Sequence, residues 1–217
     1  MTRLGPRDLD LYVITTGTLV SGRAHAEIAA AAAEGGATAV QLRAPELDDD
    51  HLVPLAAAVG RICDDAGVLF IVNDRVEVSV ACGAAGAHVG QADLPGVARS
   101  LLGPGRILGV SVASPDEAQA AEASGADYLG VTVWDTATKP DAVPVGLDGL
   151  RAVVEATALP TIGVGGIDET NAGRVIEAGA SGIAVIAAVA RAEDPLEAVR
   201  RLRSVVDDAW EARGVHG

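Results

Sequence analysis

Short apolar runs recur along the chain, and they are nearly continuous rather than alternating with polar residues. Parallel strands that are buried on both faces show this pattern, whereas half-exposed strands alternate apolar with polar positions. Because the runs are rich in Val, Ile and Leu, we interpret them as eight buried parallel strands. The predicted strands cover residues 11–16, 39–44, 69–74, 87–90, 107–112, 128–133, 161–166 and 182–186.

Longer segments rich in Ala and Leu separate these runs, with apolar positions spaced as on one face of a helix. Asp194 followed by Pro195 is typical of a helix start, and Gly67, Gly125 and Gly179 stand where helices commonly end. The predicted helices cover residues 24–34, 48–66, 75–82, 95–102, 115–124, 147–157, 170–178 and 194–213.

Strands and helices therefore alternate along the chain, which indicates an α/β fold. Eight βα units within 217 residues favour a single (β/α)₈ TIM barrel, with residues 1–217 forming one domain. A doubly wound open sheet is the alternative, but it usually carries a Gly-rich fingerprint after its first strand. The segment TTGTLVSG at residues 15–22 is not such a fingerprint. In a barrel, functional residues lie at the carboxyl ends of the strands.

Composition and charge narrow the classes of ligand. The net charge is −14 and aromatic residues make up 2% of the chain, so binding to a nucleic acid is not expected. No apolar run is long enough to span a membrane, and the charged start MTRLGPRDLD does not resemble a signal peptide, so we expect a cytoplasmic protein. Cys63 and Cys82 have no metal-binding spacing and are interpreted as small buried residues. Barrels of this size often associate, so the sequence allows a homo-oligomer.

Polar residues and glycines gather where the predicted strands end, and we expect them to form one site. They are Gln41, Arg43, Asn73, Asp74, Asp93, Ser111, Thr136, Thr138, Lys139, Gly166, Ile186 and Ala187. Asp74 and Asp93 provide the hard oxygen ligands that Mg²⁺ prefers, and Mg²⁺ usually takes only one or two protein carboxylates. Arg43 and Lys139, the only lysine of the chain, are suited to phosphoryl oxygens.

The remaining candidates suit a heterocycle and a second phosphate. Gln41, Asn73 and Ser111 can hydrogen-bond a neutral heterocycle, and backbone amides after the last two strands commonly bind phosphate in such barrels. We therefore expect two anionic small-molecule substrates to meet at the barrel mouth. No Ser/His/Asp or Cys/His set for nucleophilic catalysis is apparent, and His88 is expected to play a supporting role.

Plainer interpretations exist for single residues. Asp74 and Asp93 could each only cap the helix that follows, and Arg43 could pair with a buried acid. The Thr-rich segment 136–138 could be an ordinary loop. The occurrence of all these residues on one predicted face favours a site.

Several segments, taken together, resemble thiamine phosphate synthases in order and spacing. The resemblance extends from Leu11 to about Val199, and it is carried by VQLR, VNDRVEV, AHVGQADLP, GVS, ADYLGV, TATKPDA, GVGGI and GIAVIAAV. This family has a (β/α)₈ barrel and couples a hydroxymethylpyrimidine diphosphate with a thiazole phosphate, which yields thiamine phosphate and diphosphate in a Mg²⁺-dependent substitution. The diphosphate leaves before the thiazole nitrogen attacks, so that no protein nucleophile is needed.

The resemblance also implies roles for individual residues. The pyrimidine diphosphate would be held by Gln41, Arg43, Asn73 and Lys139, with Ser111 against the pyrimidine and Mg²⁺ on Asp74 and Asp93. Thr136, Thr138, Gly166, Ile186 and Ala187 would bind the thiazole phosphate. Within this set, Arg43, Lys139 and Ser111 are the expected catalytic residues.

Departures from the family pattern leave two alternatives. Pro45 replaces a usual lysine and the segment 131–135 is shorter than usual, which would suit a non-catalytic or altered-substrate paralogue that binds thiamine-type phosphates. A thiazole tautomerase is the other alternative, although Ala113 stands where that chemistry needs a histidine.

Overall fold

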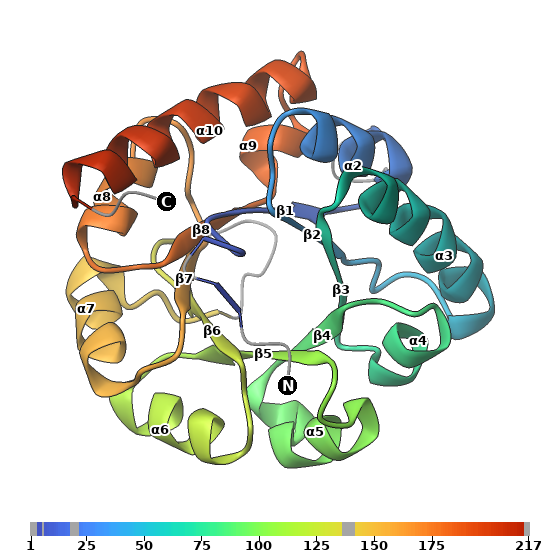
Figure 1. Cartoon of the computed structure of the whole chain (residues 1–217), viewed down its shortest axis with the longest axis horizontal. Coiled ribbons are helices and arrows are strands. Elements are labelled where there is room, and N and C mark those ends of the chain that lie inside the picture. The colour runs from blue at the N-terminus through green and yellow to red at the C-terminus, as the bar shows by residue number, and fades with distance from the viewer. Residues whose placement is uncertain (1–3, 6, 18–21, 136–141, 215–217) are drawn as a thin grey trace.

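The computed structural model describes residues 4–5, 7–17, 22–135 and 142–214, and these form a closed parallel barrel (Figure 1). The strands follow one another around the barrel in sequence order, and the last pairs with the first, with Leu11 opposite Ile183. They are β1 (Leu11–Thr15), β2 (Ala39–Leu42), β3 (Leu69–Asn73), β4 (Gly86–Val89), β5 (Ile107–Val112), β6 (Tyr128–Thr132), β7 (Thr161–Val164) and β8 (Gly182–Val185). The predicted (β/α)₈ barrel is confirmed.

Helices surround the barrel as an outer ring (Figure 1). The side chains of Asp48, Ser114 and Asp194 each accept a hydrogen bond from a backbone amide three residues further on, which fixes the start of a helix. The helices predicted from periodicity are α2 (His25–Glu34), α3 (Asp49–Ala66), α4 (Val76–Ala81), α5 (Pro95–Leu102), α6 (Pro115–Ala123), α7 (Gly146–Ala156), α8 (Ala172–Glu177) and α10 (Pro195–Ala212).

Two short helices were not predicted. The 3₁₀ helix η1 (Gln91–Asp93) follows β4, and α9 (Ala187–Ala190) follows β8. Both are too short for a period of 3.6 residues to be visible in the sequence. Both stand in the loops at the carboxyl ends of the strands, where they shape the mouth of the barrel.

The core has an outer and an inner part because side chains alternate along each strand. Leu11 and Val13 belong to the large outer cluster shared with the helices. Tyr12 belongs to a second cluster, which we call the inner cluster. Tyr128 and Ile71 also lie in this second cluster, and all three side chains are completely buried. Among the described residues, none of the helices is long and apolar enough to cross a membrane.

Gly109 on β5 makes room for the large residues of the inner cluster. A Cβ atom at this position would lie 2.4 Å from the Tyr128 hydroxyl oxygen and 2.5 Å from His88 Nδ1. Both separations are well below van der Waals contact, so only glycine allows these two polar tips to meet inside the barrel.

A partly buried ion-pair network joins Arg7 and Asp10 to the last helix. Asp10 is 1% exposed and accepts hydrogen bonds from Arg203 at 2.8 and 3.1 Å and from Arg7 at 2.7 Å. Asp207 contacts the same two arginines. The buried charge of Asp10 therefore has two cationic partners, which the low-dielectric interior requires.

Asp10→Asn is expected to lower the free energy of unfolding by about 2–3 kcal/mol, because the partly buried guanidinium groups of Arg7 and Arg203 lose a charged, buried acceptor. Chemical denaturation monitored by circular dichroism measures this change. Asp148→Asn is the matched control, since it removes an exposed ion pair with Arg151 and should leave stability unchanged. Equal midpoints for Asp10→Asn and wild type would contradict the assigned role.

Candidate active site

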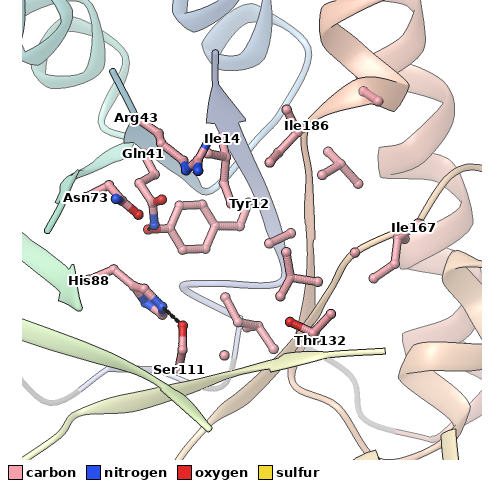
Figure 2. A pocket seen from close by; sticks show the side chains of 18 of the residues that line it. Tyr12, Ile14, Gln41, Arg43, Asn73, His88, Ser111, Thr132, Ile167 and Ile186 are labelled. Carbon is pink, nitrogen blue, oxygen red and sulfur yellow. Dashed lines mark hydrogen bonds between the residues drawn. The ribbon is translucent and has the colours of Figure 1, made fainter. Parts of the chain in front are cut away.

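A cavity of about 440 Å³ opens at the carboxyl ends of the strands. Most of the predicted site residues line it, namely Gln41, Arg43, Asn73, Asp74, Ser111, Gly166, Ile186 and Ala187. Figure 2 shows that Arg43, Gln41 and Asn73 point into the same space as His88 and Ser111. Thr136, Thr138 and Lys139 lie outside the described residues, and Asp93 does not line the cavity.

Arg43 brings a cation to this cavity. It follows β2, is partly exposed, and forms no hydrogen bond or ion pair with any residue that the structure describes. The interpretation that it pairs with a buried acid is therefore wrong for this part of the chain. Its five N–H donors are suited to phosphoryl oxygens of a ligand.

Asp74 stands directly after β3 with a backbone φ of +60°. Such a conformation costs about 1–3 kcal/mol for a residue with a side chain, although Asp tolerates it better than most. It also explains why β3 ends at Asn73, one residue earlier than predicted. Its amide donates to the His88 carbonyl oxygen at 2.8 Å, which fixes the residue at the cavity rim. The helix α4 begins after Arg75, whose side chain does not cap it.

Asp93 lies in η1 and is exposed. Its Oδ2 atom accepts a hydrogen bond from the Gly90 amide at 2.8 Å, as a capping residue would. Gly90 itself lines the cavity. This hydrogen bond stabilises η1 and does not cap α5, the helix that follows, while Oδ1 has no hydrogen-bond partner within the described ranges. Within these ranges no cluster of three or more His, Cys, Asp or Glu side chains could hold a metal.

A chain of hydrogen bonds crosses the cavity floor, and the sequence analysis missed most of it. Gln41 Nε2 lies 3.0 Å from the Tyr12 hydroxyl oxygen, which lies 3.1 Å from that of Tyr128. The Tyr128 hydroxyl oxygen lies 2.9 Å from His88 Nδ1. His88 Nε2 lies 2.9 Å from Ser111 Oγ (Figure 2). We refer to these five residues as the floor relay.

The floor relay contains a Ser–His pair, which the sequence analysis did not expect. Its members come from neighbouring strands: His88 on β4 is paired with Gly109 on β5, and Ser111 follows two residues later on the same face. A further signal was available, because Tyr12 and Tyr128 are the only tyrosines of the chain and each stands within an apolar strand. A buried tyrosine hydroxyl usually has a hydrogen-bond partner.

Backbone turns form the side of the cavity next to β7 and β8. Gly166 has a φ of +64°, and a Cβ atom there would lie 3.0 Å from the Asp135 carbonyl oxygen. Glycine is therefore required both by conformation and by space. Ile186 and Ala187 stand at the start of α9, where the first amides of a helix have no partner within the helix. This side offers N–H donors to an anion.

Burial raises the pKa of Tyr12 and Tyr128 above the ordinary value. Above pH about 10 the unfolded chain would release protons that the folded chain retains, so the stability falls as pH rises above that value. Since the chain has no other tyrosine, we expect tyrosinate absorbance to appear only together with alkaline unfolding. Absorbance and circular dichroism measured in one titration test this, and tyrosinate formation in the folded protein would contradict it.

Comparison with known proteins agrees with this geometry. A family model described as thiamine monophosphate synthase matches residues 11–189. The thiamine-phosphate synthase of Moorella thermoacetica is 52% identical over 203 residues, which cover 92% of this chain and 97% of the relative. That of Chloroflexus aurantiacus is 46% identical and covers 94% and 95%. The structure of thiamine phosphate pyrophosphorylase from Pyrococcus furiosus has a TM-score of 0.87 at 38% identity, covering 94% and 98%. The chain therefore belongs to the thiamine monophosphate synthase family.

Proposed function

We propose that this chain is a transferase that couples hydroxymethylpyrimidine diphosphate with thiazole phosphate, which yields thiamine phosphate and diphosphate. The observation that carries the proposal is the cavity itself, which combines a cation, a neutral polar floor and a side of backbone turns. These three parts match a diphosphate, an uncharged heterocycle and a second phosphate. The relatives named above share the activity, so neither the tautomerase nor the non-catalytic paralogue is favoured.

In this proposal each side of the cavity holds a different part of the substrates. Arg43 and Asn73 bind the diphosphate, and Gln41 and Ser111 bind the pyrimidine. Gly166, Ile186 and Ala187 offer backbone groups to the thiazole phosphate. Lys139, Thr136 and Thr138 are assigned from the sequence alone, with Lys139 on the diphosphate and the threonines on the thiazole substrate.

The main contribution of Arg43 to the reaction would be to stabilise the negative charge that develops on the leaving diphosphate. As the bond from the pyrimidine methylene carbon to the diphosphate breaks, negative charge accumulates on the leaving oxygens, and a guanidinium placed in advance stabilises it. The thiazole, anchored through its phosphate, is then positioned for attack by its ring nitrogen. Buried Cys63 has a pKa raised to about 12 by burial and provides no thiolate nucleophile.

Asp74 and Asp93 would hold Mg²⁺. Asp74 lies at the cavity rim, and Oδ1 of Asp93 makes no hydrogen bond with the described residues. These two carboxylates fit a cation that completes its coordination shell with water and phosphate oxygens. When bound, the ion would neutralise charge on the diphosphate. We place the reaction in the cytoplasm, with which the free thiols of Cys63 and Cys82 agree.

One assay tests the proposal: the protein is mixed with both substrates and Mg²⁺, and thiamine phosphate and diphosphate are measured. Equal amounts of both products are expected, and none without Mg²⁺. Binding of both substrates without product would support the paralogue instead. Isomerisation of a thiazole phosphate without coupling would support the tautomerase.

A further inference from the structure

We propose that Tyr12, Tyr128 and His88 are positioning residues that set the hydrogen-bonding polarity of the cavity floor. They act as a directional relay that makes Ser111 a donor and Gln41 an acceptor toward the pyrimidine. This inference rests on the proposed function, because it names what orients the residues that contact the heterocycle.

The direction of the relay follows from proton counting. Each tyrosine hydroxyl has one proton, and a neutral imidazole has one N–H and one acceptor nitrogen. The Gln41 amide nitrogen can only donate, so Tyr12 accepts from it and directs its own proton to Tyr128. Tyr128 in turn donates to His88 Nδ1, which places the histidine proton on Nε2, facing Ser111.

The opposite direction leaves a buried proton without an acceptor. Tyr12 would then receive hydrogen bonds from both Gln41 and Tyr128, and its own hydroxyl proton would have no acceptor among the described residues. Although Tyr12 lines the cavity, its relative exposure is 0%, so water does not readily replace the missing acceptor. A buried donor without a partner is costly, so the first direction is the stable one.

Neutral tyrosines are needed for this order, and burial provides them. Both hydroxyl groups lie in the inner cluster, where a phenolate would be poorly solvated and the pKa of each tyrosine is raised. The relay therefore consists of an amide, two phenols, an imidazole and a hydroxyl. Because each of these groups makes a defined hydrogen bond to the next, reversing one requires that its neighbours reverse as well.

The polarity at the two ends matches an aminopyrimidine. Gln41 Oε1 and the Ser111 proton make no hydrogen bond with the part of the chain that the structure describes, so both are available to a ligand. An amino group can donate to Gln41, and a ring nitrogen can accept from Ser111. The same order argues against Ser111 as a nucleophile, because His88 Nε2 donates to the serine and cannot remove its proton.

A double-mutant cycle tests whether Tyr128 acts through Ser111. Tyr128→Phe and Ser111→Ala are each expected to lower kcat/KM for the pyrimidine diphosphate about tenfold, the effect of one hydrogen bond. In the Ser111→Ala background, Tyr128→Phe should cost at most about threefold more, through Tyr12 and Gln41. KM for the thiazole phosphate should stay unchanged. Equal tenfold losses in both backgrounds would overturn the relay.

Ile71→Val is the matched control for packing. Ile71 is completely buried in the same inner cluster but forms no part of the relay. Its effect on kcat/KM should be the same in both backgrounds, whatever its effect on stability. If wild type forms no thiamine phosphate, the proposed function fails; if wild type is active and Tyr128→Phe behaves as Ile71→Val does, only the relay fails.

A spectroscopic measurement keeps the inference testable where Tyr128→Phe does not fold. Nitrogen-15 NMR distinguishes the two neutral imidazole tautomers, and His88→Gln identifies the signal among the four histidines. We expect the proton on Nε2 and a hydrogen-bonded, unprotonated Nδ1. A proton on Nδ1 in the wild-type protein at neutral pH would overturn the proposed direction.

Discussion

Arg43→Ala is expected to lower kcat/KM for the pyrimidine diphosphate by roughly 10²–10³-fold, the usual loss for one preorganised group that stabilises developing charge. Arg43 lines the cavity and has no ion-pair partner among the residues described, so none of these residues neutralises its charge. Removing it deprives the leaving diphosphate of a fixed cation. Steady-state kinetics with the thiazole phosphate at saturation measure the effect, which should appear mainly in kcat.

Two variants show whether the effect belongs to Arg43 and its geometry. Arg43→Lys keeps the charge but loses the planar fork, and should recover only part of the activity. Arg151→Ala removes an exposed arginine of α7 that pairs with Asp148 and should behave as wild type. Wild-type kinetics for Arg43→Ala would show that the diphosphate is bound elsewhere.

The barrel could be predicted because its strands are buried on both faces. A run such as LYVIT has no charged residue and three aliphatic ones, and all five of its residues are buried. Local backbone geometry was harder to predict. The strand predicted to reach Asp74 ends one residue earlier because Asp74 adopts a positive φ, and no feature of apolar periodicity reports that change.

The site was predicted where polar residues interrupt the ends of apolar strands. This reasoning found Gln41, Arg43 and Ser111, all of which line the cavity. It missed Tyr12 and Tyr128 because they stand early in their strands, below the mouth, where the ring of a tyrosine is indistinguishable from other core residues. Their hydroxyl groups matter only because strands far apart in the sequence bring the two tips within 3.1 Å.

Asp74→Asn is expected to cause the second large loss of activity, because Asp74 is assigned to Mg²⁺. This variant should lose roughly 10²–10³-fold in Mg²⁺-dependent kcat/KM, since the carboxylate charge is removed from a preorganised site. Asn is the closest substitute in shape and also tolerates a positive φ, so the backbone at +60° should be retained. Binding of Mn²⁺ in the presence of inorganic diphosphate, followed by electron paramagnetic resonance, measures the metal without turnover.

Two further variants, Asp74→Gly and Asp93→Asn, distinguish the loss of a carboxylate charge from a change in the local backbone. Glycine relieves the strain at φ +60° but also removes the carboxylate, so a folded Asp74→Gly should be as inactive as Asp74→Asn. In Asp93→Asn the side-chain oxygen can still accept from the Gly90 amide, so η1 should stay intact while one charge is lost. A parallel loss of Mn²⁺ binding in Asp93→Asn would support a shared ion. Unchanged Mn²⁺ binding in Asp93→Asn, with loss of binding in Asp74→Asn, would show that Asp93 only caps its turn. Wild-type Mn²⁺ binding in both variants would contradict the metal assignment, because each variant removes only the charge of its carboxylate.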